Sequence, residues 1–464
     1  MALGRRRAER QEELFVPQDR LPRSEGHVFY RRLNQLLSEA GFDRFVEELC
    51  QAHYAAEGRG RPSIPPGVYF RMLLVGYFEG IGSQRGIAWR CHDSLSLREF
   101  LGVPLTADAP DHSSLSRVRD RLPLEVHAAA FQFALKLADE QGLLKAKTVG
   151  VDSTTLEANA AMKSIVRRDT GDDWRAYVVG LMKQEGVVAK DQEPTDEELR
   201  RFDKRRKHKK VSNEDWESET DPDARIAKMK DGRTHLAYKA EHTVDLESEF
   251  ILSAEVYHAD QMDPRTLADS VMEAQVQLHE AGVERTIKEV AADKGYHAAE
   301  QIELAEALSL RTYIPEPERR NRSRWTDKPP ELKRAVYANR RRIRTDKSKR
   351  LQRWRSERVE RSFAHVCETG GARRTWLRGI DKVRKRHVIA ALARNLGLLM
   401  RALFGIGTPR SRQQSGQAKQ GLTSLLQLAW LERRLARIAR AAWTALLTIW
   451  LRRRDGQHEY ALVA

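Results

Sequence analysis

The segment KTVGVDSTTLEA (residues 147–158) marks the point where the chain changes from helical to strand-like patterning. It is short and rich in β-branched residues, which is typical of a β-strand. Two further strands are predicted in HLAYKAEHTVDLESEFILSAEVYHA (residues 235–259), around a turn at 246–249. The pattern then predicts a helix at 263–282, a strand at 286–297, a helix at 298–309, a strand at 311–315 and a helix at 347–368. This order predicts an α/β fold with a mixed sheet and flanking helices.

Upstream of this segment, residues 28–140 have the spacing of short helices. Apolar residues recur at helical intervals, as at Leu33 and Leu37, and Gly80 interrupts the pattern. Ser83 follows shortly afterwards and can cap the next helix. We therefore predict an all-α region of short helices and tight turns, which is compatible with a helix-turn-helix fold.

The charge of the chain is strongly basic and unevenly distributed. Of 464 residues, 82 are Lys or Arg and 66 are Asp or Glu, which gives a net charge of +16. Residues 311–361 carry 19 Lys or Arg against 7 Asp or Glu, so most of the excess lies there. Such a field favours a polyanionic partner. By contrast, residues 191–223 are polar and mixed in sign, which predicts a solvated insert or linker.

Cysteine content and apolar runs argue against several classes of protein. Three cysteines are too few and too scattered for a disulfide framework or a CxxC zinc site, and they fit a reducing cytoplasm. The N-terminal sequence has no apolar core behind its arginines, so we expect no signal peptide. The longest apolar run, at 441–451, is shorter than the ~20 residues of a membrane-spanning helix. We therefore expect a cytoplasmic protein with no membrane partner, not a secreted, collagenous or multispan protein.

Three carboxylates are notable for their places in the predicted elements. Asp152 lies in a hydrophobic strand, Asp293 at the carboxyl end of another strand, and Glu360 on a basic helix. Carboxylates from separate elements can hold Mg²⁺, which prefers oxygen ligands, and two such ions can promote phosphodiester cleavage. Each also has a structural alternative: the aspartates as turn or cap residues, and Glu360 as a salt-bridge partner of nearby arginines. Glu357, one turn earlier, competes with Glu360.

Longer motifs occur in a fixed order along the chain. In the helical region they are SIPPGVYFRMLLVGYFEGI (63–81) and PDHSSLSRVRDRL (110–122); in the α/β region they are VGVDSTTLEANA (149–160), DARIAKMKDGRTHLAYKAEHTVDLESEFILSAEV (223–256), AADKGYH (291–297), VERSFAHVCETGGARRTWLRG (359–379) and NLGLLMR (395–401). Together, over about residues 28–403, they resemble the DDE transposases of bacterial insertion sequences. The helical part resembles the N-terminal domain of InsH-like members.

The resemblance implies a site, a cofactor and a reaction. It implies that Asp152, Asp293 and Glu360 form a metal-binding catalytic triad on an RNase H-like fold, with Mg²⁺ or Mn²⁺, in two copies, as the cofactor. It further implies a transposase that binds the terminal inverted repeats of its element, cleaves DNA strands and transfers them to target DNA, as a homodimer assembled on DNA. Tyr296 matches the family's DxGY motif, and Arg355 lies near a family arginine that precedes the glutamate.

The resemblance also divides the chain. It implies an extended or disordered N-terminus at 1–27, a helical DNA-binding domain at 28–140, an RNase H-like catalytic domain at 141–408 with a polar insert at 163–230, and a linker with a C-terminal helix at 409–464. The chain departs from many relatives around the third carboxylate. Arg353, Ser356 and Cys367 stand where those relatives have Tyr, Arg and Lys. The third ligand therefore rests on the motif VERSF (359–363).

Basic residues are the candidate DNA contacts. Arg and Lys neutralise phosphates without reading bases, so the run NRRRIRTDKSKRLQRWRSER (339–358) is the best phosphate-contacting segment. Trp354 within it, and Trp325 before it, could stack on an unpaired base. A solvated helix face is the alternative explanation of the arginines. The predicted contacts are Arg340, Arg341, Arg342, Arg355 and Lys294, together with Ser83, Arg85 and Arg117 of the helical region, where Arg119 also lies near a turn.

Two alternatives to a transposase stay open on the sequence. A stand-alone nuclease of the same fold would need the triad but not the recognition of terminal repeats. A non-catalytic DNA-binding protein would use only the helical region and the basic run. The GxGxxG and GxxxxGK[ST] motifs are absent, so a nucleotide-driven motor is unsupported. Alternation along the strand places Tyr238 and His242 on one face, where they are candidates to line the site beside Asp152.

Overall fold

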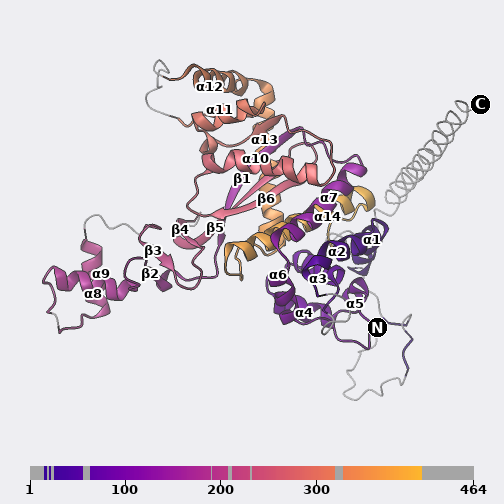
Figure 1. The fold of residues 1–464 in the computed structure, drawn as a ribbon, viewed down its shortest axis with the longest axis horizontal. Coiled ribbons are helices and arrows are strands. Elements are labelled where there is room, and N and C mark those ends of the chain that lie inside the picture. Colours follow the sequence, from indigo (N-terminus) through magenta and orange to yellow (C-terminus); the bar gives the residue numbers. More distant parts are fainter. Residues whose placement is uncertain are drawn as a thin grey trace, which may run out of the picture.

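The computed structural model describes residues 15–17, 20–21, 26–55, 63–189, 191–206, 212–229, 232–318 and 328–409. Within these residues the chain forms a helical region, an α/β region and a projecting insert (Figure 1). The predicted C-terminal helix at 409–464 lies outside the described residues except for residue 409, and so does most of the segment 1–27. The boundaries of the predicted domains stay predictions.

The helical region consists of short helices whose ends are set by local sequence signals. Ser83, Ser94 and Asp111 each accept a hydrogen bond from a main-chain N–H three residues later, which caps the helix that follows. Gly80 ends a helix with a φ of 71°, a conformation that a side chain would strain. The helices are α1 (Gly26–Glu39), α2 (Phe42–Cys50), α3 (Pro66–Glu79), α4 (Gln84–Asp93), α5 (Leu95–Leu101), α6 (His112–Arg121) and α7 (Leu124–Glu140).

The sheet is mixed, as the sequence predicts. Its strands are β1 (Thr148–Glu157), β4 (Arg225–Lys228), β5 (Thr234–Asp245), β6 (Ile251–His258), β7 (Glu289–Ala291) and β8 (Arg311–Tyr313). Strand β1 pairs antiparallel with β5 and parallel with β7, and β7 pairs parallel with β8. Strands β4 and β6 both pair antiparallel with β5. The strand predicted at 286–297 is short, and its last part is the 3₁₀ turn η4 (Lys294–Tyr296).

Helices cover both faces of this sheet. They are α10 (Asp263–Glu280), α11 (Ala299–Ala307), α12 (Pro330–Ile343), α13 (Asp346–Phe363) and α14 (Ile380–Phe404). Helix α13 crosses β1 so closely that a Cβ at Gly150 would lie 2.9 Å from a methyl carbon of Val359. Helix α14 packs against α7 and β6 and so joins the helical region to the sheet. It is the one described helix long and apolar enough to cross a membrane, but most of it is buried in the protein, as in a core helix.

Residues 191–223 belong to a folded insert, so of the two alternatives predicted for this segment the structure supports an insert rather than a linker. It contains β2 (Ile165–Arg167), α8 (Trp174–Gln184), α9 (Asp196–Arg205) and β3 (Trp216–Ser218), and it projects away from the sheet (Figure 1). Thr195 and Glu198 form a capping box at the start of α9. Val178, Met182 and Leu199 form a separate small core. So few apolar residues are needed for this core that the composition of the segment did not reveal it.

Candidate active site

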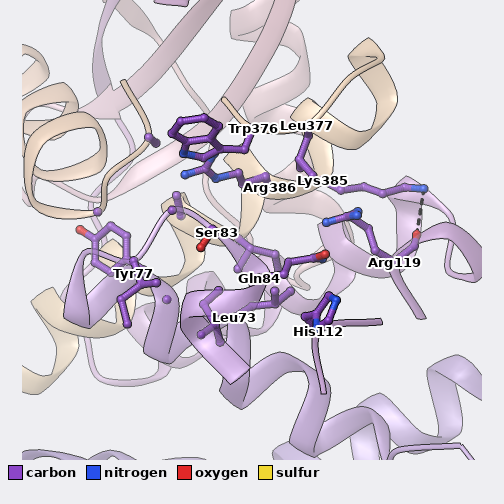
Figure 2. A pocket seen from close by; sticks show the side chains of 18 of the residues that line it. Leu73, Tyr77, Ser83, Gln84, His112, Arg119, Trp376, Leu377, Lys385 and Arg386 are labelled. Carbon is purple, nitrogen blue, oxygen red and sulfur yellow. Dashed lines mark hydrogen bonds between the residues drawn. The ribbon is translucent and has the colours of Figure 1, made fainter. Parts of the chain in front are cut away.

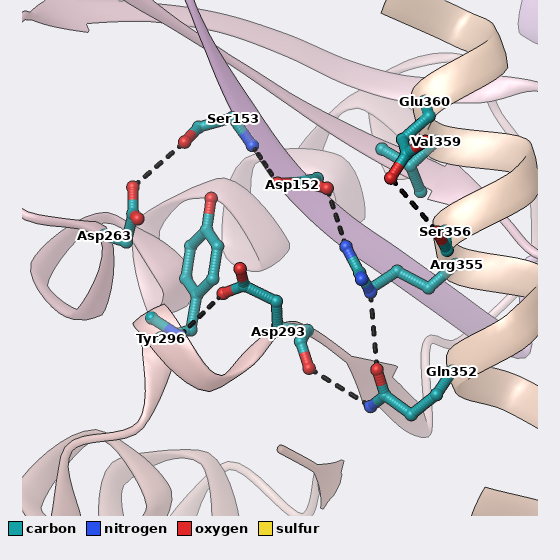
Figure 3. Close-up of polar contacts among 12 residues, drawn as sticks. Asp152, Ser153, Asp263, Asp293, Tyr296, Gln352, Arg355, Ser356, Val359 and Glu360 are labelled. Atoms are coloured by element: carbon teal, nitrogen blue, oxygen red, sulfur yellow. Dashed lines mark hydrogen bonds and ion pairs between the residues drawn. The ribbon is translucent and has the colours of Figure 1, made fainter. Parts of the chain in front are cut away.

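Three elements bring the predicted carboxylates to one edge of the sheet. Asp152 lies within β1, Asp293 follows β7 by two residues, and Glu360 lies near the C-terminal end of α13. Because β1 and β7 are parallel neighbours and α13 packs across β1, the three side chains face a common region (Figure 3).

The carboxylate of Asp152 is half-buried and closely contacted. Its Oδ1 accepts a hydrogen bond from the main-chain N–H of Ser153 at 2.8 Å, and its Oδ2 accepts one from Arg355 Nη1 at 2.6 Å. Burial raises the pKa of Asp152, the charge of Arg355 opposes this, and the charges of Asp293 and Glu360 raise the pKa further. Burial is the largest of these effects, so the raised pKa reports mainly the removal of this carboxylate from water.

The position of Asp293 is set by the turn that it caps. Its Oδ1 accepts a hydrogen bond from the N–H of Gly295 at 2.7 Å. A Cβ on Gly295 would lie 2.9 Å from that oxygen, so a side chain there would displace the carboxylate. Gln352 of α13 donates to the carbonyls of Ala292 at 3.1 Å and Tyr313 at 2.6 Å. These contacts tie the helix that carries Glu360 to the ends of the two neighbouring strands.

The geometry favours Glu360 over Glu357 as the third carboxylate. Glu360 is exposed and accepts a hydrogen bond from Ser356 at 3.0 Å, and its charge acts on the pKa of Asp152. Glu357 is bound to Arg361, which also pairs with Glu249 at 2.7 Å. Glu357 therefore belongs to a different ion-pair group, and the catalytic role of Glu360 stays a prediction.

The donor chemistry of this region fits a divalent cation. Carboxylate oxygens are the ligands that Mg²⁺ and Mn²⁺ prefer. Among the residues that the structure describes, no three His, Cys, Asp or Glu side chains lie close enough together to hold a metal ion as they stand. The guanidinium of Arg355 supplies positive charge at Asp152 instead. Shared ligation by Asp152, Asp293 and Glu360 would therefore require Arg355 to release Asp152.

A second charged group lies on the opposite face of β1, and sequence reasoning missed it. We call it the Lys239 cluster; it comprises Ser153, Lys239, Glu241, Asp263, Thr266 and Tyr296. Lys239 Nζ lies 2.8 Å from Asp263 Oδ1 and 3.3 Å from Glu241 Oε2. Tyr296 donates to Glu241 Oε2 at 2.8 Å, and Ser153 donates to Asp263 Oδ1 at 3.0 Å.

The Lys239 cluster links the segments that carry the two aspartates. Ser153 is the residue after Asp152, and Tyr296 ends the turn that Asp293 caps. A residue close in sequence to each aspartate therefore donates to a carboxylate that Lys239 contacts. Ser153 donates to Asp263, and Tyr296 donates to Glu241. The signal in the sequence was the spacing of Lys239 and Glu241, two residues apart on one strand face, but their partners lie on other elements.

Tyr238 and His242 do not have the predicted place in the site. His242 lies opposite Asp152 in the sheet, but it is fully buried, and its ring nitrogens lie 2.8 Å from Ser362 Oγ and 2.9 Å from His387 Nε2. Burial lowers the pKa of His242, which favours the neutral ring. Tyr238 donates to buried Asp221 at 2.8 Å. Both residues are engaged in core hydrogen bonds, so the prediction that they line the site is wrong.

The arginines of the predicted basic run differ in how strongly the protein holds them. Arg340 pairs with Glu316 at 2.6 Å, and Arg342 donates to the carbonyl of Thr312 at 2.9 Å. Arg341, between them, is exposed on α12. These contacts give Arg340 and Arg342 a structural role, and they leave Arg341 best placed for a phosphate.

The other predicted contacts of the α/β region lie close to the carboxylates or to α13. Lys294 is exposed next to Asp293, and Arg355 lies on Asp152. Trp354 is half-buried, and the guanidinium carbon of Arg358 lies 4.4 Å from the centroid of its ring. Arg358 therefore covers one face of the ring that was expected to stack on a base. Trp325 lies outside the described residues.

In the helical region the predicted contacts are partly structural. Ser83 Oγ accepts the N–H of Gly86 at 3.1 Å as the cap of α4. Arg85 and Arg117 are exposed, as a DNA contact requires. Arg119, by contrast, is only 8% exposed. Packing of α14 against α6 therefore places Arg119 away from the open surface of the helical region.

Comparison with known families matches two separate parts of the chain. Residues 15–121 match a family described as a transposase domain (DUF772), and residues 316–400 match a family described as a transposase DDE domain. The second match contains Glu360, Arg355 and the basic helices α12 and α13. No curated protein matches the chain.

Proposed function

Because this chain belongs to the DDE transposases of insertion sequences, we propose that it cuts DNA at the ends of its element and joins those ends to target DNA. What supports this proposal most is that Asp152, Asp293 and Glu360 lie on neighbouring elements, namely β1, the end of β7 and α13 (Figure 3). Three carboxylates in this region against the one guanidinium that pairs with Asp152 favour cation binding.

The proposed reaction has two phosphoryl-transfer steps. In the first, water adds to a DNA phosphorus and the bond from phosphorus to the 3′ oxygen breaks, which leaves a 3′ hydroxyl and a 5′ phosphate. In the second, that 3′ hydroxyl adds to a phosphorus of target DNA and displaces another 3′ oxygen, which takes up a proton. Mg²⁺ or Mn²⁺, in two copies, would supply stabilisation of charge on the attacking and leaving oxygens.

The residues of the chain have distinct parts in this proposal. Asp152, Asp293 and Glu360 would bind the ions. Arg355, once released from Asp152, would offset charge on the DNA phosphate, and exposed Lys294 would do so from the turn beside Asp293. Because both side chains are donors only, neither competes with the carboxylates for the ions.

The route of DNA follows the positive charge. Arg341 and Arg353 are exposed on α12 and α13, and Arg344 is exposed directly after α12; all three would neutralise phosphates without reading sequence. Arg85 and Arg117 of the helical region would contribute to recognition of the terminal inverted repeats. A homodimer assembled on two element ends would allow both ends to be joined to one target.

The test compares two carboxylates of the site with Glu357, which lies on the same helix as Glu360. Asp152→Asn and Glu360→Gln should lower cleavage of a labelled element end in Mg²⁺ by at least about 100-fold, the upper part of the range seen when metal coordination is disturbed. DNA binding in a gel shift should persist or tighten, because a negative charge is removed. Glu357→Gln is the matched control and should cleave within a few-fold of the parent. Parent-level cleavage by either of the first two variants would exclude the assignment.

A further inference from the structure

A cavity of about 250 Å³ lies between the helical region and the α/β region (Figure 2), and none of the three carboxylates lines it. One side is formed by α3, by the start of α4 and by α6. The other is formed by the segment 370–377 and by α14. Ser83, Arg85 and His112, which line it, are exposed, so the cavity opens to solvent. Its volume is near the lower end of about 300–1,000 Å³ for small-molecule sites.

Two guanidinium groups point into this cavity without a close carboxylate partner. Arg119 of α6 is 8% exposed, and its Nε has no hydrogen-bond partner among the described residues; Asp120 Oδ1 lies 3.9 Å away. Arg386 of α14 donates to the main-chain carbonyls of Gly371 at 2.8 Å and Arg374 at 3.4 Å. Burial, and then the charge of Arg119, lowers the pKa of Arg386 to about 10. Two like charges in a protected space favour a bound anion.

A third polar group of the cavity also offers a donor. Gln84, the first residue of α4, accepts a hydrogen bond from Ser116 at its Oε1, while its Nε2 has no partner in the described part of the chain. Lys385 differs from the two arginines, because it pairs with Asp381 at 2.7 Å and donates to the carbonyl of Arg119. Lys385 therefore stabilises the wall of the cavity. The groups without a partner, Arg119 Nε and Gln84 Nε2, are donors, which match phosphate oxygens.

The rest of the wall is apolar and aromatic. Leu73, Tyr77 and Ile81 line one side, and Trp376, which is 53% exposed, lines the opening (Figure 2). A bare phosphate would leave this surface uncovered. A planar ring attached to a phosphate would place the ring against the apolar wall and the phosphate on the guanidinium groups.

We infer that this cavity binds a single nucleotide, with its phosphate on Arg119, Arg386 and Gln84 and its base against Trp376 and the apolar wall. The nucleotide has two possible sources with the same chemistry: a free nucleotide, or an unpaired nucleotide in a DNA strand. The inference does not depend on the carboxylate site, which lies elsewhere in the α/β region.

The primary test places a carboxylate among the donors. Gln84→Glu keeps the shape of the side chain and the acceptor for Ser116, and it offers Arg119 and Arg386 an internal anion. Gln51→Glu, at an exposed position of the helical region, is the control for the added negative charge. Binding of dAMP and of inorganic phosphate to the full-length protein is measured by calorimetry without divalent metal. Because like charges at a site cost several kcal/mol, we expect Gln84→Glu to weaken dAMP binding at least about 10-fold and Gln51→Glu to leave it unchanged.

The base contact and the source are tested separately. Trp376→Ala, at an exposed side chain, should weaken dAMP but not phosphate. If dAMP does not bind, an oligonucleotide with an unpaired end should bind more tightly than a blunt duplex, and Gln84→Glu should abolish that preference. Equal affinity for phosphate and dAMP, or no effect of Gln84→Glu on either probe and on the unpaired end, would overturn the inference. Asp152→Asn should retain binding, so failure of the proposed catalytic function is distinguishable.

Discussion

Two groups of charged side chains lie back to back across strand β1, and they differ in how the fold compensates them. On the α13 side, Asp152 faces two further carboxylates, and Arg355 is its one ion-pair partner. On the α10 side, Lys239 lies between Asp263 and Glu241, and hydroxyl groups donate to both carboxylates. The first group has one guanidinium for three carboxylates. The second has one ammonium and several hydroxyl groups for two carboxylates, although Glu241 Oε1 has no hydrogen-bond partner among the described residues. This difference separates a site suited to a ligand from a group that supports the fold.

The contrast between the two groups requires that the Lys239 cluster stabilises the fold, and this is the prediction with the largest expected effect. Lys239→Met keeps the length of the side chain but removes its charge, so Glu241, which is fully buried, loses its cation. We expect the free energy of unfolding to fall by about 3–5 kcal/mol, the cost of leaving one partner of a buried pair uncompensated. The measurement is denaturant unfolding of the full chain. Lys294→Met, at an exposed lysine, is the control and should change stability by less than about 0.5 kcal/mol.

A substitution in the carboxylate site should lower cleavage but not stability, the opposite of what is expected for Lys239→Met. Asp293→Asn retains an oxygen that can accept the N–H of Gly295, so the turn can form, but it removes one of the crowded negative charges. We expect cleavage in Mg²⁺ to fall at least about 100-fold. We expect the free energy of unfolding to stay within about 0.5 kcal/mol of the parent. A variant that unfolds more easily but still cleaves would reverse the roles assigned to the two groups.

Tyr296 tests whether the two groups are coupled. Tyr296→Phe removes the donor to Glu241 at the end of the turn that Asp293 caps, so it should lower stability by about 1–3 kcal/mol. It should also raise the Mg²⁺ concentration needed for half-maximal cleavage, because the turn is less firmly held. Tyr238→Phe is the matched control, since it removes a buried tyrosine donor to Asp221 elsewhere on the same sheet. If both variants have the Mg²⁺ dependence of the parent, the cluster stabilises the fold without positioning Asp293.

The sequence was sufficient for what depends on local pattern. Alternation and β-branching predicted β1, β5 and β6, and helical spacing predicted α10 and α13, so the mixed α/β fold is confirmed. Asp152 could be singled out because a carboxylate in a hydrophobic strand needs a partner. The choice between Glu357 and Glu360 needed the rotation of α13 about its axis, which sets the carboxylate that faces β1.

Features that depend on contacts between distant segments were not predictable. The Lys239 cluster was not predicted, because Asp263 lies on α10 while Lys239 and Glu241 lie on β5. Arg119 looked like a surface arginine, because its burial is created by α14, more than 250 residues later in the chain. The composition of residues 191–223 left an insert and a linker equally open, because the small core of the insert has few apolar residues. In each case the sequence shows the residue type but not the partner that determines its role.

The smallest expected effect concerns the basic run, where exposed Arg341 is compared with Arg342, which is hydrogen-bonded within the protein. Arg341→Ala should weaken binding to the element end and to random DNA alike, and it should lower the slope of log affinity against log salt by about 0.9, the value for one phosphate contact. Arg342→Ala is the comparison, because Arg342 already donates to Thr312 and its pKa is lowered by burial. Its loss should reduce stability more than it changes the salt slope. The measurement is a gel shift over a series of salt concentrations with both DNAs. Equal slopes for the parent and Arg341→Ala would mean that Arg341 does not contact phosphate, and the DNA path would then lie away from α12.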